Sequence, residues 1–252
     1  MKKFLKTIIP SPIRKILRLI LIDASDLIRG TRFKFPKDSD SRRQEGESWS
    51  ERITIAQRIN ISDWAENKKH NLLLAVSTFQ NLAIYPGKIF SFWKKVGSPS
   101  KKAGYLVGIN IIKNKLDFDY GGGLCQLSGL LYHLALTAGL DVVERHPHSV
   151  DLYTEETRYT PLGADATTAY GYKDLRILNN LKIPMCFRIM VEENQLVGSI
   201  CASQALKEYD LKFNKTVVDQ RENVDTLRRS KSGEFEVIIK QSYRISDHEQ
   251  IL

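Results

Sequence analysis

The sequence predicts an α+β fold with helices first, then one central helix, then a mainly antiparallel sheet. Two observations support the helices: apolar residues recur at helical spacing near the N-terminus, between 13 and 28, and again between 127 and 138. A third supports the sheet, since the second half carries apolar, β-branched runs separated by turn residues. This succession of elements is typical of the α+β class.

The N-terminal segment predicts a basic amphipathic helix, with Arg14, Lys15 and Arg18 off its apolar stripe. Such a helix lies on an anionic membrane surface or packs on its own domain. The apolar run is too short to cross a bilayer, and no convincing cleavage site follows the basic start at 1–3. We therefore expect a cytoplasmic protein, with residues 1–30 as a possible peripheral contact at the inner face of the membrane.

Polar residues between about 30 and 50 predict a linker, so residues 1–50 form an appendage and 51–252 the main domain. A second helical segment is expected from Ile53 to Phe79, with a possible break at Ser62, a plausible N-cap. Ile89–Trp93 reads as a short extended run or an aromatic plug.

Further strands are expected at 106–112, 167–178, 185–199, 211–218 and 234–243. The central helix should end at Gly139, because glycine readily adopts the left-handed conformation of a C-cap. A strand beginning at Leu140 should then carry the two histidines of Arg145-His146-Pro147-His148-Ser149.

Composition narrows the function classes. The chain has 252 residues, a net charge of +9 and 42% hydrophobic residues, which suffices for a core. The basic balance suits nucleic acid, an anionic membrane or an acidic substrate, but no nucleic-acid-binding motif is present and nucleic acid is not expected. Three cysteines do not form a disulfide framework, and Cys186 and Cys201 lie in apolar runs typical of buried thiols. No cofactor is expected.

Gly121-Gly122-Gly123-Leu124-Cys125-Gln126 is the strongest chemical signal in the chain. Three glycines allow a sharp turn and a close approach to a ligand. Cys125 falls at the start of the central helix, where backbone N–H groups and the helix dipole favour a thiolate. These features predict an activated cysteine.

A catalytic cysteine also needs a base and a group that orients the base. His146 and His148 alternate on the expected strand, so only one can face the thiol, and we favour His148. Asp165 and Asp174 are the candidates for the orienting carboxylate.

Other residues of the same motifs could bind ligand. Gln126 and the amides of Gly121, Gly122 and Gly123 could polarise a carbonyl. Arg145 could hold a carboxylate or phosphate, next to Ser149. A rival interpretation uses Cys125, His146 and His148 as metal ligands, although their spacing matches no familiar metal motif. Aromatic residues could line a groove or simply fill the core: Phe92, Trp93 and Tyr120.

These motifs resemble the VanW family. The likeness covers about residues 67–199 and includes the Gly-Gly-Gly-Leu-Cys-Gln and Arg-His-Pro-His-Ser motifs. It also includes the segments at 71–75, 85–93, 104–105, 165–167 and 174–180. The short chain with a basic N-terminal helix resembles the B-type VanW proteins.

The resemblance implies a link with the glycopeptide (vancomycin) response or the bacterial cell envelope. Two functions remain open: a Cys–His hydrolase or acyl transferase acting on amides of peptidoglycan or its precursors, or a non-catalytic binder of a cell-wall ligand. The order of cysteine, histidine and aspartate is also similar to that of transglutaminase-like and papain-type enzymes, which is an analogy of order alone.

Overall fold

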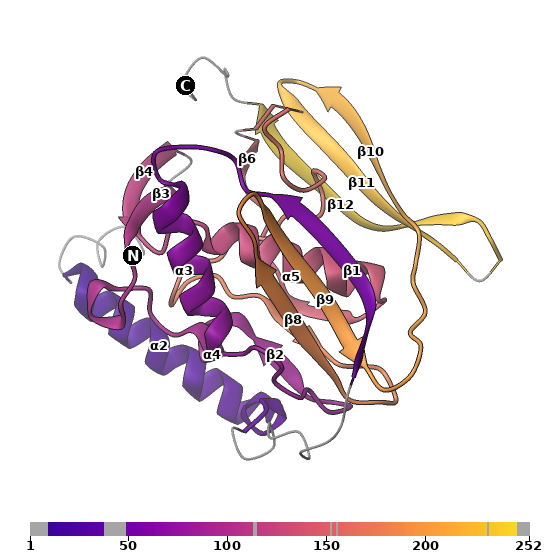
Figure 1. Ribbon diagram of the computed structural model, residues 1–252, viewed down its shortest axis with the longest axis horizontal. Helices are drawn as coiled ribbons and strands as arrows, with labels where there is room; N and C mark the ends of the chain where they lie inside the picture. Colours follow the sequence, from indigo (N-terminus) through magenta and orange to yellow (C-terminus); the bar gives the residue numbers. More distant parts are fainter. Residues whose placement is uncertain are drawn as a thin grey trace.

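The computed structural model describes residues 10–37, 49–112, 115–151, 153–154, 156–230 and 232–245. The part of the expected membrane contact that falls on residues 1–9 lies outside the described residues. The fold is α+β, as predicted (Figure 1). The described helices are α2 (Ser11–Ile28), α3 (Ala65–Ser77), α4 (Phe92–Val96) and α5 (Leu124–Thr137), with short 3-10 turns η1 (Thr31–Lys34) and η2 (Lys101–Ala103). The described strands are β1 (Ser50–Arg58), β2 (Ile89–Ser91), β3 (Val107–Ile112), β4 (Lys115–Tyr120), β5 (Asp141–Glu144), β6 (Val150–Asp151), β7 (Arg176–Leu178), β8 (Met185–Val191), β9 (Gln195–Ala202), β10 (Leu211–Val218), β11 (Arg221–Arg229) and β12 (Phe235–Ile245).

Within the described residues these strands form several small sheets instead of one. Their orders are β1-β9-β8, β10-β11-β12-β6, β2-β7-β5 and the hairpin β3-β4. All pairings in these sheets are antiparallel except the short parallel contact between β12 and β6. Through that contact the C-terminal sheet reaches the chain that follows the two histidines.

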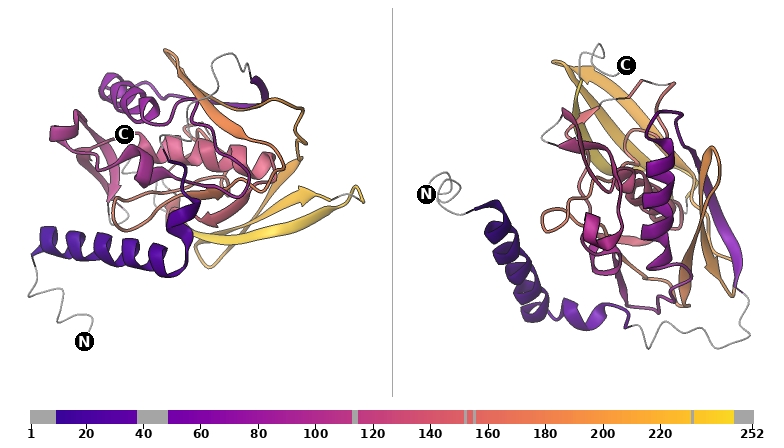
Figure 2. Two further views of the ribbon diagram at one scale, coloured as in Figure 1. Left: turned by 90° about the horizontal axis from the view of Figure 1, so that it is seen from below. Right: turned by 60° about the vertical axis from the view of Figure 1, so that its left-hand side comes forward.

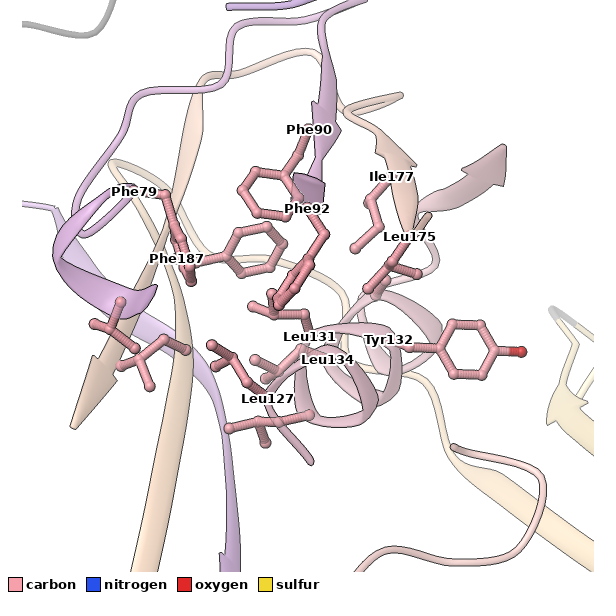
Figure 3. Packing of buried hydrophobic residues seen from close by; sticks show 14 of the residues in the cluster. Phe79, Phe90, Phe92, Leu127, Leu131, Tyr132, Leu134, Leu175, Ile177 and Phe187 are labelled. Carbon is pink, nitrogen blue, oxygen red and sulfur yellow. The ribbon is translucent and has the colours of Figure 1, made fainter. Parts of the chain in front are cut away.

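Helix α5 is the centre of the hydrophobic core. Its leucines at 127, 130, 131 and 134 are fully buried, and its N-terminal cysteine is partly exposed. The helix packs on the sheet of β1, β9 and β8, where Gly198 leaves room for Leu130. Phenylalanines 79, 90, 92 and 187 pack beside it with Leu175 and Ile177 (Figure 3). Burial on this scale fixes the position of α5, so the site at its N-terminus stands on a rigid element.

The expected helix from Ile53 to Phe79 is wrong in its first part. Ser50–Arg58 forms strand β1, which lies between the linker and α3 in the chain and pairs with β9. Isoleucines at 53 and 55 are two positions apart, which is the period of a strand, and β1 pairs with the largely buried strand β9. Helix α3 begins at Ala65 after Trp64, and the side chain of Ser62 does not cap it.

Other expected elements differ in extent. The strand at 107–112 and those at 211–218 and 235–245 are confirmed, whereas the intervening β11 was not predicted. The expected strand at 185–199 is the hairpin of β8 and β9, and 167–178 is a loop that ends in β7. Strand β5 ends at Glu144, so the histidines lie in a loop and not on a strand. Cys186 and Cys201 are fully buried, as expected.

Helix α2 lies at the edge of the molecule (Figure 2). Its polar side faces the body: Asp26 is buried and accepts hydrogen bonds of 2.6 and 3.1 Å from the guanidinium of Arg176. Lys15 and Arg18 lie over the rings of Tyr170 and Tyr172, each at 4.8 Å. The apolar stripe of α2 points into solvent. None of the helices in the described part of the chain has the length and apolar character that crossing a bilayer requires.

Candidate functional site

The glycine loop places the start of α5. Gly121 and Gly123 have φ values of 84° and 99°, a left-handed backbone that glycine adopts without strain. Gly122 lies against β3, where an added Cβ would come within 2.7 Å of the Cα of Gly108. The three glycines therefore serve the turn and the close approach of two backbones.

Asn71 on α3 holds this loop in place. Its side-chain amide donates to the carbonyl oxygens of Gly122 and Leu106 at 3.1 and 3.0 Å, and its own oxygen accepts from the Leu106 N–H at 2.8 Å. Asn71 is fully buried, and its bond to Gly122 is shielded from water. Asn71 thus connects the glycine loop with α3 and with the residue that precedes β3.

Cys125 occupies the first turn of α5. Its Sγ lies 3.7 Å from the hydroxyl of Thr167 and 3.8 Å from the carbonyl oxygen of Thr168. Burial alone would raise its pKa, but hydrogen bonding and the charge of His148, together with the contacts to Thr168 and Thr167, lower the pKa to about 7. The helix dipole acts in the same direction. The thiol of Cys125 is therefore ionised more easily than that of an ordinary cysteine.

His148 lies beside this thiol and is almost fully buried. Its Nδ1 is 2.7 Å from Oδ2 of Asp165, which also accepts from the His148 backbone N–H at 2.7 Å. Nε2 is buried without a well-aligned hydrogen bond in the described part of the protein. Catalytic hydrogen bonds are often long or poorly aligned before substrate binds. Burial lowers the pKa of His148, but bonding to Asp165 and Cys125 outweighs burial and raises it to about 10.

The carboxylate of Asp165 is itself fixed. Arg145 donates to Oδ1 at 2.9 Å and to the backbone oxygen of Asp165, and Tyr243 donates to Oδ1 at 2.5 Å. Burial opposes ionisation, but bonding to His148 and the charge of Arg145 hold the pKa of Asp165 well below its ordinary value. The guanidinium of Arg145 also lies 4.6 Å over the ring of Tyr132 and bonds to Gln241. Asp165 therefore stays charged and keeps the imidazole in one orientation.

The structure thus brings Cys125, His148 and Asp165 together, and it places Arg145 behind them as support for the carboxylate. The predicted ligand grip by Arg145 is therefore hard to reconcile with its position, because its guanidinium is already bonded to Asp165, Gln241 and Tyr243.

The structure does not bring the other candidates into this group. His146 points elsewhere, with Nε2 3.1 Å from Oε1 of Glu144. Gln126 is buried and donates to the carbonyl of Arg58 at 2.8 Å, so it ties β1 to α5. Ser149 is exposed, and its carbonyl oxygen accepts from the N–H of Arg244.

Asp174 belongs to a separate buried network. It accepts from the Ser91 hydroxyl at 2.6 Å, from the Trp93 N–H at 3.0 Å and from Arg176 at 3.1 Å. Burial raises the pKa of Asp174 despite these bonds. Its role in the structure is to connect α4 with the ion pair that holds α2.

Two further expectations can be compared with the structure. Phe92 and Trp93 are buried in the core, and Tyr120 packs against it, which favours the packing interpretation of these aromatic residues. Within the described residues no three His, Cys, Asp or Glu side chains are grouped as a metal site, so the proposed set of Cys125, His146 and His148 is not supported.

Several residues around the site could not be predicted from the sequence. Tyr243 and Gln241 come from β12, about a hundred positions after Arg145, and nothing local in their sequence marks them. Tyr153 and Tyr159 lie in the loop after the histidines with their rings 5.2 Å apart. The Arg158–Asp151 ion pair, at 2.7 Å, holds that loop. Only the aromatic content of the loop could have pointed to it.

An α+β domain with a cysteine at a helix N-terminus, a buried histidine beside it and a carboxylate behind the histidine defines a protein with a Cys–His–Asp site. The chain belongs to the family of VanW-like proteins, whose family model matches residues 67–201, more than half of its length. That range includes Cys125, His148 and Asp165 but not Tyr243.

Two curated relatives share this region. The chain is 33% identical over 141 residues to the vancomycin B-type resistance protein VanW of Enterococcus faecalis, an alignment that covers 56% of this chain and 51% of that protein. It is 33% identical over 141 residues to the uncharacterized protein YoaR of Bacillus subtilis, covering 56% and 45%. The alignment therefore spans about half the length of these relatives. No solved structure matches the chain significantly, and the analogy with transglutaminase and papain folds stays a prediction.

Proposed function

We propose that this protein is a cysteine-dependent amide hydrolase or acyl transferase with Cys125 as nucleophile. The observation that carries the proposal is the 2.7 Å bond from His148 Nδ1 to Asp165, which turns Nε2 toward the thiol at the start of α5. Nucleophile, base and orienting group in this order are the elements of covalent acyl chemistry.

In the proposed first step the thiolate of Cys125 attacks the carbonyl carbon of an amide, and a C–S bond forms. His148 then donates its Nε2 proton to the leaving nitrogen as the C–N bond breaks. Water or an amine then attacks the thioester carbon and loses a proton to Nε2, and the C–S bond breaks to release the product and the Cys125 thiolate. Asp165 stays ionised throughout and stabilises the imidazolium.

The backbone offers a donor for the developing oxyanion. The N–H of Cys125 has no acceptor among the described residues, unlike those of Leu124 and Gln126, which bond to Gly121 and Gly123. It lies at the positive end of the helix dipole. This N–H replaces Gln126 as our candidate for the oxyanion site, because the Gln126 amide is engaged with Arg58.

For the substrate we propose a chemical class. The Enterococcus faecalis relative is named a vancomycin B-type resistance protein, which favours a cell-wall peptide or peptidoglycan precursor as the amide. The alternative is a non-catalytic binder of such a ligand, in which Cys125 would have no special reactivity.

Alkylation separates these two functions. Iodoacetamide should label Cys125 rapidly with a midpoint near pH 7, and His148→Gln should slow labelling at neutral pH at least tenfold. Cys186 and Cys201 are fully buried, and Cys125→Ala identifies any background from them. Intact-mass detection of a thioester after incubation with muropeptides tests the acyl step. Labelling no faster than that of an unfolded peptide thiol contradicts the enzyme and favours the binder.

We also propose that α2 attaches the protein to an anionic membrane surface. Each side chain of its solvent-facing stripe has an exposed fraction between 46% and 85%. The stripe consists of Ile13, Ile16, Leu17, Ile20, Leu21, Leu27 and Ile28. Phe33 continues it, with Arg29, Arg32 and Lys34 exposed nearby. An apolar face bordered by cations suits a bilayer that contains anionic lipids.

Vesicle sedimentation tests this attachment. The protein should bind phosphatidylglycerol vesicles more strongly than phosphatidylcholine vesicles, and Ile20→Ser with Leu21→Ser should remove most of the binding. Val217→Ser with Val218→Ser changes exposed apolar residues on β10 and should leave binding unchanged. Equal binding by the α2 variant and the parent protein would overturn this assignment.

A further inference from the structure

Lys68 on α3 lies at the same end of α5 as Cys125. Its side chain crosses the glycine loop so closely that a Cβ on Gly123 would come within 2.7 Å of its Cγ. Gly123 and Cys125 are two positions apart, so their backbones are separated by at most about 7 Å. The Cε of Lys68 lies 3.5 Å from the same point, so the amine is held over the loop that leads into Cys125.

The amine of Lys68 has an aromatic neighbour but no counter-ion among the residues that the structure describes. Its Nζ lies 5.7 Å from the centre of the Tyr159 ring. Burial raises the pKa of Tyr159 and the charge of Cys125 raises it further, which places this ring near the thiol as well. Lys68 is partly buried, and its pKa is lowered to about 8 by loss of water around it.

The neighbouring lysine shows the contrast. Lys69, one position later, pairs with Glu66 at 2.8 Å. Among the described residues no carboxylate lies within ion-pairing distance of Lys68, and no hydrogen-bond acceptor is present for its Nζ. A desolvated cation without a protein partner is costly, and an anionic ligand removes that cost.

We propose that Lys68 binds a carboxylate of the substrate, so that the acyl substrate of Cys125 is anionic close to the amide under attack. This inference rests on the proposed function, because it assumes that the substrate reaches Cys125. Tyr159 would form one wall of the same subsite, and the Gly121–Gly123 loop its floor.

Two small alkylating reagents test the subsite. Iodoacetate and iodoacetamide transfer similar groups to the same thiolate, with iodide as the leaving group, but only iodoacetate carries a carboxylate. The ratio of their rates therefore reports the charge near Cys125 and is independent of how much thiolate is present. Lys68→Met should lower the iodoacetate rate relative to the iodoacetamide rate on the order of fivefold, as expected for one partly screened ion pair.

Matched variants complete the design. Lys68→Arg should keep the ratio of the parent protein, and Lys69→Met, which removes a neighbouring charge that is already paired, should change it by less than twofold. In the parent protein the ratio should also fall as pH rises through about 8, since Lys68 loses its charge there, whereas Lys68→Arg should show no such fall. Thermal unfolding of each variant checks that the fold is retained.

The outcomes distinguish this inference from the proposed function. An unchanged ratio in folded Lys68→Met overturns the carboxylate subsite, even where Cys125 is highly reactive. Slow reaction of Cys125 with both reagents contradicts the enzyme, yet the ratio still reports Lys68. A pH profile of the parent protein that is flat between 7 and 9 also contradicts the assignment.

Discussion

The hydroxyl of Tyr243 donates a 2.5 Å hydrogen bond to Oδ1 of Asp165, the carboxylate whose other oxygen holds His148. Tyr243 is fully buried on β12. Burial is the main cause that raises its pKa, and the charge of Asp165 raises it further, so the hydroxyl remains a donor. Strand β12 thus supports the candidate site directly, although it lies outside the segment that the family model matches.

Replacing Tyr243 by phenylalanine should loosen this support. A hydrogen bond to a charged group contributes about 1.5–3 kcal/mol, and the ring is retained in Tyr243→Phe, so we expect a loss of that size in the free energy of unfolding. Denaturant titration measures it. Tyr85→Phe alters an exposed tyrosine and should change stability by less than about 0.5 kcal/mol. Equal stability of both variants would show that the Tyr243 bond contributes little.

The pH dependence of Cys125 should depend on Asp165. In Asp165→Asn the imidazole loses its negative partner, so the pKa of His148 falls and the thiolate loses a cationic neighbour. The midpoint of iodoacetamide labelling should therefore move upward from about pH 7, by about one pH unit or more. A pH series of labelling rates measures the shift.

Asp174→Asn is the matched comparison, because Asp174 was the other candidate for the orienting group and lies in the network around Trp93 and Arg176. It should leave the labelling midpoint near pH 7 while lowering stability. A larger shift in Asp174→Asn than in Asp165→Asn would reverse the assignment of the two carboxylates.

The sequence predicts a site around Cys125 with His148 as the favoured partner, because glycine loops and helix starts are local signals, but it leaves Asp165 and Asp174 as alternatives for the orienting carboxylate. The preference for His148 over His146 agrees with the geometry, but the strand on which the two were expected to alternate ends at Glu144. Both histidines lie in a loop after β5, and their directions are set by Asp165 and Glu144, not by alternation along a strand.

Long-range partners account for most of what the sequence could not predict. Strand β1 was expected to be helical because its identity depends on pairing with β9, some 140 positions later. The direction of the apolar stripe on α2 depends on the ion pair of Asp26 with Arg176, and amphipathic spacing alone does not specify which face meets the body.

The contact between Gly122 and Gly108 predicts a sharp sensitivity to one methyl group. In Gly122→Ala the new Cβ would lie 2.7 and 2.8 Å from backbone atoms of Gly108, which cannot rotate away. We expect a loss of about 1–3 kcal/mol in the free energy of unfolding and slower alkylation of Cys125, because the start of α5 must shift. Denaturant titration and iodoacetamide labelling measure the two effects.

A second glycine on α5 provides the control. A Cβ on Gly129 would make only ordinary contacts, 3.6 Å or more, with the segment at 164–166. Alanine is also the better helix former, so Gly129→Ala should be neutral or stabilising by up to about 1 kcal/mol. Destabilisation by Gly129→Ala comparable to that of Gly122→Ala would mean that crowding at Gly108 is not the cause.

The buried ion pair of Asp26 and Arg176 should decide whether α2 stays on the body. Asp26→Asn removes a charge that is 4% exposed and accepts two bonds from Arg176, a change that typically costs about 3 kcal/mol or more. The loss should be local, because the core around α5 does not involve α2. Amide hydrogen exchange should therefore accelerate within 13–28, while alkylation of Cys125 keeps its rate.

Asp23→Asn breaks only the exposed pair with Lys94 and should leave exchange in α2 within about twofold of the parent protein. Equal protection of α2 in both variants would show that the cation–π contacts of Lys15 and Arg18 hold the helix without the buried pair.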